Sequence, residues 1–189
     1  KCKQEHRPAL LTYTVSGDPN KKKSFEILKS ISPHADICEI GVGHNCNTGD
    51  GKQIQDSTYR AIKNGIKIKD TFAIVKKFKK TKNAKPVILM GYYNPIFQMG
   101  VEGFCQRAME VGADGVIIVD LPPEEAEALL EAVSDCDLAT IFLVAPTSTS
   151  NRIVRIAELS KGFIYCVSVT GVTGVRNVIS DEVRSMATE

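Results

Sequence analysis

The feature that most constrains the fold is a regular alternation of two kinds of segment along the chain. Short apolar runs rich in Val, Ile and Leu, which are typical of buried strands, alternate with longer amphipathic stretches, which are typical of helices. The expected strands are residues 9–15, 36–41, 86–91, 114–119, 138–144 and 163–168. The expected helices are residues 20–31, 52–64, 68–80, 101–111, 123–134 and 150–160. Six strand-then-helix units predict a parallel sheet with crossover helices.

Several of these helices have recognisable ends. Asp18-Pro19 and Thr149-Ser150 offer capping oxygens, and Pro122-Pro123 suits a first turn, which needs no N–H donors. Gly112 and Gly162 stand where helices should end, just before the next strand. These signals support the boundaries drawn from the apolar pattern.

Two architectures remain, an open doubly wound sheet and a (βα)8 barrel. Neither a Gly-x-Gly-x-x-Gly motif after the first strand nor a P-loop occurs, which argues against nucleotide-binding open sheets. Continuous apolar runs such as 87–90 and 115–119 are typical of barrel strands buried on both faces. We therefore predict an α/β fold of the (βα)8 TIM-barrel class, with residues 1–189 as a single, incomplete domain. A full barrel needs about 250 residues, so we expect about six βα units and exposed strand edges prone to association.

Composition narrows the class of protein further. Apolar residues make up 43% of the chain, enough for a core, and no stretch reaches the roughly 18 apolar residues of a membrane span. There is no secretory leader pattern, and the six cysteines contain no Cys-x-x-Cys pair, so we expect reduced thiols and a cytoplasmic location. His44 and Cys46 lie two residues apart, but two ligands are too few, and we expect no metal.

The net charge of +2 hides an asymmetry between the two halves of the chain. Residues 1–94 carry 18 basic and 8 acidic side chains, whereas residues 95–189 carry 6 basic and 14 acidic ones. A basic half can mark a nucleic-acid surface, but these lysines fall on helix-like stretches with few aromatic residues between them. We interpret them as solvated helix faces and expect no nucleic-acid partner.

Active sites of (βα)8 barrels form at the carboxyl ends of the strands, and Glu39 is the most informative residue there. It lies within an otherwise apolar strand, residues 36–41. Burial of the carboxyl group would raise its pKa toward neutrality, as general acid–base catalysis requires. The alternative, a structural Glu paired with a lysine or with backbone amides, stays equally open from position alone.

Four other features at strand ends are candidates for the same site. Asp50 lies between two glycines, which suits a turn, or it is a second carboxylate that orients substrate. Tyr165 is either a core residue or a site residue. Asp120 ends the fourth strand, and the glycine-flanked loop 171–174 is a weak candidate for a phosphate cradle.

Seven motifs follow one another along the chain. They are Gly17-Asp18-Pro19; Glu39-Ile40-Gly41-Val42; Asp50-Gly51 with Ile54-Gln55; Met90-Gly91-Tyr92-Tyr93-Asn94-Pro95; Val119-Asp120-Leu121-Pro122-Pro123-Glu124-Glu125; Phe142-Leu143-Val144-Ala145-Pro146-Thr147; and Phe163-Ile164-Tyr165-Cys166-Val167-Ser168 with Gly171-Val172-Thr173-Gly174. With these motifs in this order, the sequence resembles the tryptophan synthase alpha subunit family over about residues 7–176. The resemblance implies a TIM barrel of the ribulose-phosphate-binding type. It also implies a lyase of tryptophan biosynthesis, which cleaves indole-3-glycerol phosphate to indole and glyceraldehyde 3-phosphate by a retro-aldol step.

The resemblance also implies roles for individual residues. Glu39 would be the general acid and base that protonates indole C3, Asp50 would hydrogen-bond the indole N–H, and Tyr165 would lie beside the glycerol portion. The substrate-binding positions implied are Ile54, Met90, Tyr92, Asp120, Thr173 and Gly174. No cofactor is implied in this subunit, because pyridoxal phosphate belongs to a beta partner in an alpha2beta2 tetramer.

The sequence departs from the family in two places. Residues 43–49 read Gly-His-Asn-Cys-Asn-Thr-Gly, without the prolines, the phenylalanine and the aspartate usual there, although the spacing to Asp50 is kept. That loop touches the beta subunit in the family, so partner contact is in question, and loss of prolines should loosen the loop. The chain also stops where a seventh strand would begin, which predicts weak phosphate binding. The alternative reading is therefore a catalytically impaired alpha-like module that binds or modulates a beta-type partner.

Overall fold

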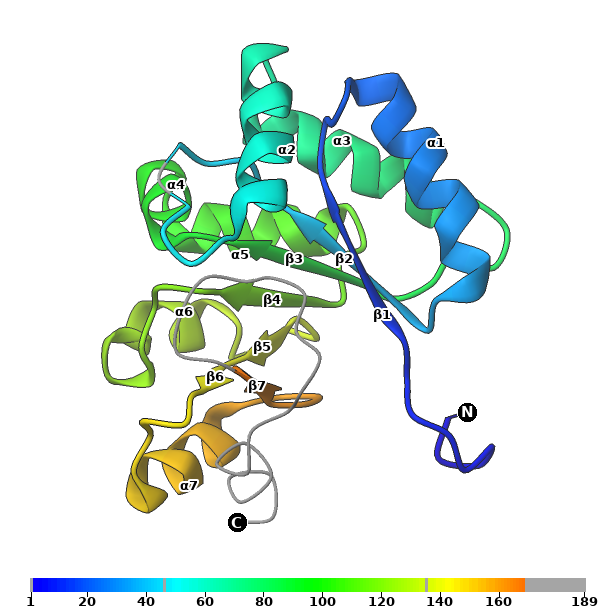
Figure 1. The fold of residues 1–189 in the computed structure, drawn as a ribbon. Coiled ribbons are helices and arrows are strands. Elements are labelled where there is room, and N and C mark those ends of the chain that lie inside the picture. Colours follow the sequence, from blue (N-terminus) through cyan, green and yellow to red (C-terminus); the bar gives the residue numbers. More distant parts are fainter. Residues whose placement is uncertain (1, 46, 135, 169–189) are drawn as a thin grey trace.

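The backbone forms an arc of parallel strands with helices packed on its outer face (Figure 1). The computed structural model describes residues 2–45, 47–134 and 136–168. The strands are β1 (Leu11–Val15), β2 (Ile37–Gly41), β3 (Val87–Gly91), β4 (Gly115–Ile118), β5 (Ala139–Ile141), β6 (Leu143–Val144) and β7 (Tyr165–Cys166). β1 to β5 pair in sequence order in one parallel sheet, and β6 pairs with β7 in a second, two-stranded sheet. The parallel α/β layout predicted from the sequence is confirmed.

The helices follow the strands in the expected alternation. They are α1 (Lys21–Ile31), α2 (Lys52–Lys63), α3 (Ile68–Lys79), α4 (Tyr93–Met99), α5 (Val101–Glu110), α6 (Glu127–Ala132) and α7 (Ser150–Leu159), with short 3-10 turns η1 (Ser32–His34) and η2 (Pro123–Glu125). Several expected elements need correction. The strand expected at 138–144 is interrupted at Phe142, and the one expected at 163–168 is reduced to Tyr165–Cys166. The helix expected at 123–134 is divided into η2 and α6, and α4 forms where no helix was expected.

The start of α1 corrects a capping assignment. The N-cap is Asn20, whose side-chain oxygen accepts from the Lys23 amide at 3.0 Å. Asp18 instead pairs with Arg60 of α2 through two hydrogen bonds of 2.9 and 2.8 Å, which lower the pKa of its carboxyl group. Asp18 therefore holds the loop after β1 against α2 rather than capping α1.

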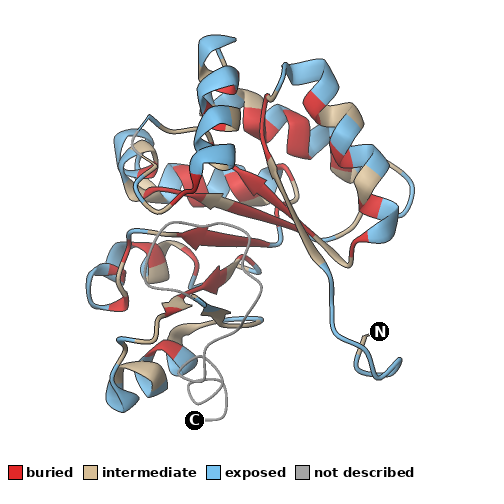
Figure 2. Cartoon of the chain, viewed as in Figure 1, coloured by how far each residue is buried: buried red, intermediate tan, exposed pale blue. Residues whose placement is uncertain are grey.

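Two separate clusters of buried side chains pack against the strands, and β4 is buried along its whole length (Figure 2). On the inner face, Ile88, Ile117 and Ile141 form a small apolar cluster, and Met90 and Tyr165 pack against it. Burial on both faces explains why the strand sequences are continuous apolar runs rather than alternating ones.

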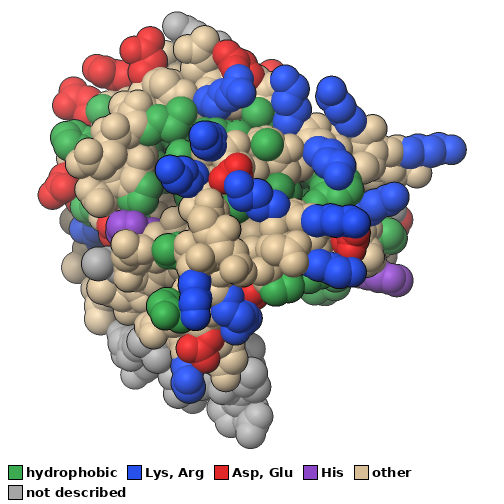
Figure 3. Space-filling view, turned by 90° about the horizontal axis from the view of Figure 1, so that it is seen from above, with side chains coloured by type: hydrophobic (Ala, Val, Ile, Leu, Met, Phe, Trp, Pro, Cys, Tyr) green, Lys and Arg blue, Asp and Glu red, His purple; other side chains and the backbone are tan. Residues whose placement is uncertain are grey.

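Charged side chains gather on the helices rather than at the sheet. Seen from above, Lys and Arg side chains cover the helices α1 to α3 (Figure 3). The lysines predicted to lie on solvated helix faces, such as Lys22, Lys63 and Lys76, are exposed.

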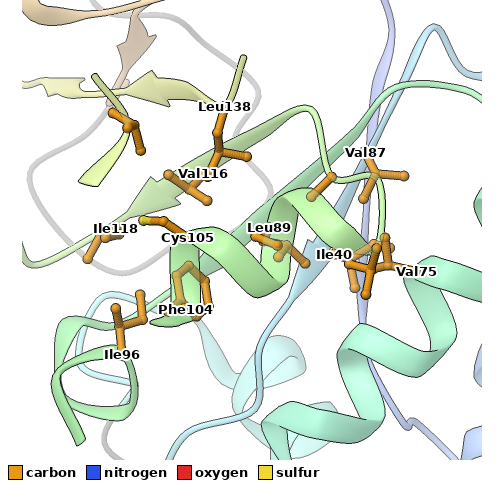
Figure 4. Close-up of a cluster of buried hydrophobic side chains, with 14 of the residues drawn as sticks. Ile40, Val75, Val87, Leu89, Ile96, Phe104, Cys105, Val116, Ile118 and Leu138 are labelled. Atoms are coloured by element: carbon orange, nitrogen blue, oxygen red, sulfur yellow. The ribbon is translucent and has the colours of Figure 1, made fainter. Parts of the chain in front are cut away.

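The outer face of the sheet carries the main core. Ile40, Leu89 and Val116 of successive strands point toward α3 and α5, where they meet Val75 and Phe104 (Figure 4). Complete burial of an aliphatic or aromatic side chain of this size contributes about 1.5–3 kcal/mol. This layer fixes the strands and so fixes the positions of the polar side chains at their carboxyl ends.

Candidate active site

Glu39 and Tyr13 lie side by side on the inner face of the sheet. The β1–β2 register pairs the two residues directly, and paired residues of neighbouring parallel strands point to the same face. A Cβ atom at Gly41 would overlap the hydroxyl group of Tyr13, so the phenol lies across β2 at the strand's carboxyl end. Glycine at position 41 leaves room for that ring.

Glu39 is a buried carboxyl group. Its residue is 5% exposed, and burial raises its pKa to about 7 from the ordinary value of 4.5. Among the described residues, its carboxyl group has no hydrogen-bond or ion-pair partner that would lower the pKa and oppose the effect of burial. The lysine-paired structural alternative considered from the sequence is therefore not what the described residues show. A carboxyl group that titrates near neutrality can both donate and accept a proton under physiological conditions.

Asp50 lies in the turn that leads into α2. It is 7% exposed, and burial raises the pKa of its carboxyl group, while a hydrogen bond from the Asn47 side chain opposes that rise. The Gln55 amide of α2 donates to the Asp50 backbone carbonyl at 2.8 Å, and the Asn47 amide donates to the Thr58 hydroxyl at 3.0 Å. The first turns of α2 thus hold Asp50 in place as a buried group rather than a solvated turn residue.

The two carboxyl groups and three phenols form one cluster. The pKa of Tyr13 is raised first by burial and then by Asp50 and Glu39. Burial, followed by the same two carboxyl groups, also raises the pKa of Tyr165 on β7. Tyr92, just after β3, has its pKa raised by burial and by Asp50. The structure therefore brings the three catalytic candidates Glu39, Asp50 and Tyr165 together at the carboxyl ends of the strands.

Tyr92 connects this cluster to the loop 43–49. Its hydroxyl oxygen accepts a hydrogen bond of 3.1 Å from the Gly49 amide, one residue before Asp50. Its ring lies 5.8 Å from the ring of His44. Beside it, a pocket of about 690 Å³ opens between the loop and α2, lined in part by His44, Asn47 and Tyr59. Tyr92 thus contacts the divergent loop as well as the site.

The other substrate-binding candidates lie in different surroundings. Ile54 lines a pocket of about 260 Å³ together with Tyr13, and Met90 packs against the inner apolar cluster. Asp120 is exposed and accepts a hydrogen bond of 2.7 Å from the Tyr93 amide, the first residue of α4. Its carboxylate therefore holds the start of a helix at the rim of the site.

Thr173 and Gly174, with the rest of loop 171–174, lie outside the described residues. The described residues contain no group of three or more His, Cys, Asp or Glu side chains placed to hold a metal ion. Within that same part of the chain, no helix is long and apolar enough to cross a membrane.

Tyr13 is a member of the cluster that sequence reasoning missed. It stands within the expected first strand, and nothing in its sequence neighbourhood singles it out. The available signal was its place in the first strand: the residue paired with Glu39 in a parallel sheet must share the inner face. Reading the register of the two strands would have found it.

Comparison with known proteins shows the family to which the chain is related. The family model for "Tryptophan synthase alpha chain" matches residues 1–189. The tryptophan synthase alpha chain of Pelagibacter ubique (strain HTCC1062) is 53% identical over 180 residues, which cover 95% of this chain and 68% of that protein. The Thermococcus kodakarensis protein of the same name is 41% identical, with 89% of this chain and 67% of that protein covered. The chain thus spans about two thirds of the length of these relatives.

Solved structures give the same result. A Mycobacterium tuberculosis tryptophan synthase structure matches with a TM-score of 0.92 at 33% identity, covering 99% of this chain and 72% of that one. A structure of the Pyrococcus furiosus tryptophan synthase a2b2 complex matches with a TM-score of 0.87 at 37% identity, covering 95% and 72%. The barrel class predicted from the sequence is confirmed by this likeness. By sequence and by fold, the chain belongs to the tryptophan synthase alpha chain family.

Proposed function

We propose that this chain, as a lyase of tryptophan biosynthesis, cleaves indole-3-glycerol phosphate into indole and glyceraldehyde 3-phosphate. One observation carries the proposal: Glu39, in the middle of β2, is a buried carboxyl group with a pKa of about 7. A retro-aldol cleavage needs a group that first gives and then takes a proton, and a carboxyl group poised near neutral pH meets that need.

Glu39 alone can carry out both proton transfers of the reaction, because it gives one proton and takes one back. The protonated carboxyl group gives its proton to indole C3, which forms an indolenine. The resulting carboxylate takes the proton of the glycerol hydroxyl group next to the bond that breaks. As that carbon becomes an aldehyde, the electrons of the broken carbon–carbon bond return to the indole ring. Asp50, in its ionised form, would accept a hydrogen bond from the indole N–H and stabilise the positive charge on the indolenine.

The remaining residues would bind and orient the substrate. Ile54, Met90 and the ring of Tyr92 offer apolar surface for indole, and Tyr165 would lie beside the glycerol portion. Thr173 and Gly174 stay candidates for the phosphate loop. Asp120 would act through α4, whose first amide it binds. The proposed chemistry uses protein groups only, with pyridoxal phosphate confined to a beta subunit.

A beta subunit in an alpha2beta2 assembly is the proposed partner, and the cytoplasm is the proposed location. The Pyrococcus furiosus relative is described as an a2b2 complex. In this chain, two exposed aromatic side chains lie on the elements next to loop 43–49, Tyr59 of α2 (67% exposed) and Phe97 of α4 (63% exposed). Exposed aromatic residues beside a pocket are typical of protein interfaces.

The test is indole release from indole-3-glycerol phosphate by the purified chain, alone and with a beta subunit. Glu39→Gln should abolish release while circular dichroism shows an intact fold. Glu110→Gln is the matched control, because Glu110 is an exposed residue of α5, paired with Arg107, and should leave release unchanged. A folded wild-type chain that releases no indole, but still binds the beta subunit, would favour the impaired alpha-like module instead.

A further inference from the structure

A further pocket lies at the opposite end of the sheet from the site around Glu39. It has a volume of about 560 Å³ and lies between the end of α1 with η1 and the loop 80–86 that joins α3 to β3. The side chains around it include Lys29, Lys82 and Lys85, together with Ser32, Thr81 and Asn83. Among the described residues, no Asp or Glu lines it. It therefore presents three cationic side chains to one concave surface.

The loop that carries two of these lysines is held in a defined conformation. The Thr81 hydroxyl donates to the Phe78 carbonyl at 2.7 Å, and the Ala84 amide donates to the Thr81 carbonyl at 3.3 Å. Asn83 has a φ of 60°, a left-handed conformation that asparagine tolerates better than most residues. Ala84 packs against the main core. Lys82 and Lys85 are thus presented by an anchored turn.

Two carboxylates at this end of the sheet are engaged with other partners. Asp36 accepts two hydrogen bonds of 2.7 Å from the Arg7 guanidinium, which lowers the pKa of its carboxyl group. Asp114 accepts from the Lys79 ammonium at 2.9 Å and from the Val87 amide at 2.7 Å. Among the ion pairs of the described residues, none includes any of the three pocket lysines. The ammonium groups of Lys29, Lys82 and Lys85 therefore have no ion-pair partner within that part of the chain.

We propose that this pocket binds a phosphorylated small molecule through its phosphate groups. Three like charges around one concavity repel one another, and an anion with two or more negative charges relieves that repulsion. The pocket volume lies within the range of about 300–1,000 Å³ that is typical of small-molecule sites. The surrounding Ser, Thr and Asn side chains add polar groups to the same wall. The site is separate from the proposed lyase centre, because it lies at the amino ends of the strands.

The test is isothermal titration calorimetry, in which the purified chain is titrated with pyrophosphate at constant ionic strength. The wild-type chain should bind, and the double variant Lys82→Gln/Lys85→Gln should bind at least about tenfold more weakly, as the loss of two charge-assisted contacts implies. Lys63→Gln/Lys76→Gln is the matched control, since it removes the same charge from exposed lysines of α2 and α3. Its affinity should stay within about twofold of wild type, because salt screens distant surface charges.

Two results would overturn the proposal. Absence of pyrophosphate binding to the wild-type chain would show that the pocket takes no such anion. An equal loss of affinity in both double variants, or no loss in either, would assign the binding to general surface charge or to another place on the chain. Lys29→Gln provides a check that does not touch the loop 80–86, and it should weaken binding in the same direction as the first double variant.

Discussion

Glu39 and Asp50 are both buried carboxyl groups, yet their surroundings differ. Burial acts alone on Glu39 and raises its pKa to about 7. On Asp50, the Asn47 side chain stabilises the ionised form and opposes the effect of burial. Two carboxyl groups in unlike surroundings can serve as acid and as ionised partner at one pH. That division matches the roles proposed for them.

The pH dependence of kcat/KM follows from this difference. The reaction needs Glu39 protonated at the start and Asp50 ionised, so the profile should be bell-shaped. Its falling limb should lie at about pH 7, where Glu39 loses its proton, and its rising limb at a pH above the ordinary pKa of 3.8 for an aspartate. A pH–rate profile of indole release measures both limbs. A rate that stays flat on going from about pH 6 to pH 9 would remove Glu39 as the proton donor.

Tyr92→Phe tests whether the phenol positions Asp50. The substitution removes the acceptor of the Gly49 amide but keeps the ring beside His44. A hydrogen bond of this kind contributes about 0.5–1.5 kcal/mol, so kcat/KM should fall by about two- to tenfold. The rising limb of the pH profile should also shift, because the turn around Asp50 loosens. Tyr93→Phe is the matched control, since the Tyr93 ring packs on Phe97 and should keep both limbs in place.

At the scale of elements, the sequence predicted the strands well and α4 poorly. β1 to β4 lie within the expected ranges, and the apolar runs of β2 to β4 are largely buried, as in strands covered on both faces. The helix α4 was not expected because it is short and Pro95 stands in its first turn. In addition, the group that accepts a hydrogen bond from its first amide is Asp120, 27 residues away. A cap that comes from another strand leaves no local signal.

Prediction from local sequence has the same limit at the candidate site. Glu39 could be predicted because a carboxylate stands out in an apolar strand. Tyr13 could not be recognised without the β1–β2 register, since a tyrosine is ordinary in a strand. Likewise, only tertiary structure shows that Asp18 pairs with Arg60 instead of capping α1.

Asp120→Ala should loosen α4. The alanine leaves the Tyr93 amide without its acceptor at a helix N-terminus, a loss that costs about 0.5–2 kcal/mol. We expect faster hydrogen exchange in residues 93–99 and a lower melting temperature, with Asp120→Asn closer to wild type because its side-chain oxygen can still accept. Hydrogen-exchange mass spectrometry checks the location. Unchanged exchange over α4 would show that the contact does not hold the helix.

At the scale of the whole molecule, the burial of Glu39 links stability to pH. In the folded chain the pKa of Glu39 is about 7, against an ordinary value of 4.5. The contribution of this bound proton to the stability of the fold is therefore fully present below about pH 4.5 and is lost as the pH rises through about 7. Glu39→Gln avoids the buried charge. The variant should therefore be more stable than wild type at pH 8 by about 1–3 kcal/mol, with the difference closing below about pH 5.

Urea unfolding at several pH values measures that difference. Glu110→Gln should show no comparable trend, because Glu110 is exposed. A Glu39→Gln chain that is less stable than wild type at pH 8 would mean that favourable contacts hold the carboxylate, contrary to its burial without a partner among the described residues. The same substitution thus separates two consequences of one residue, a loss of activity and a gain of stability.

The order in which β1 to β5 pair also bears on how the chain is made. Each of β1 to β4 lies beside the strand that follows it in the sequence, so the pairings among these five described strands use neighbouring segments of the chain. As residues leave the ribosome, each new βα unit meets a neighbour that has already been synthesised. The pairings of β1 to β5 can therefore form one after another, in the order in which the message is read.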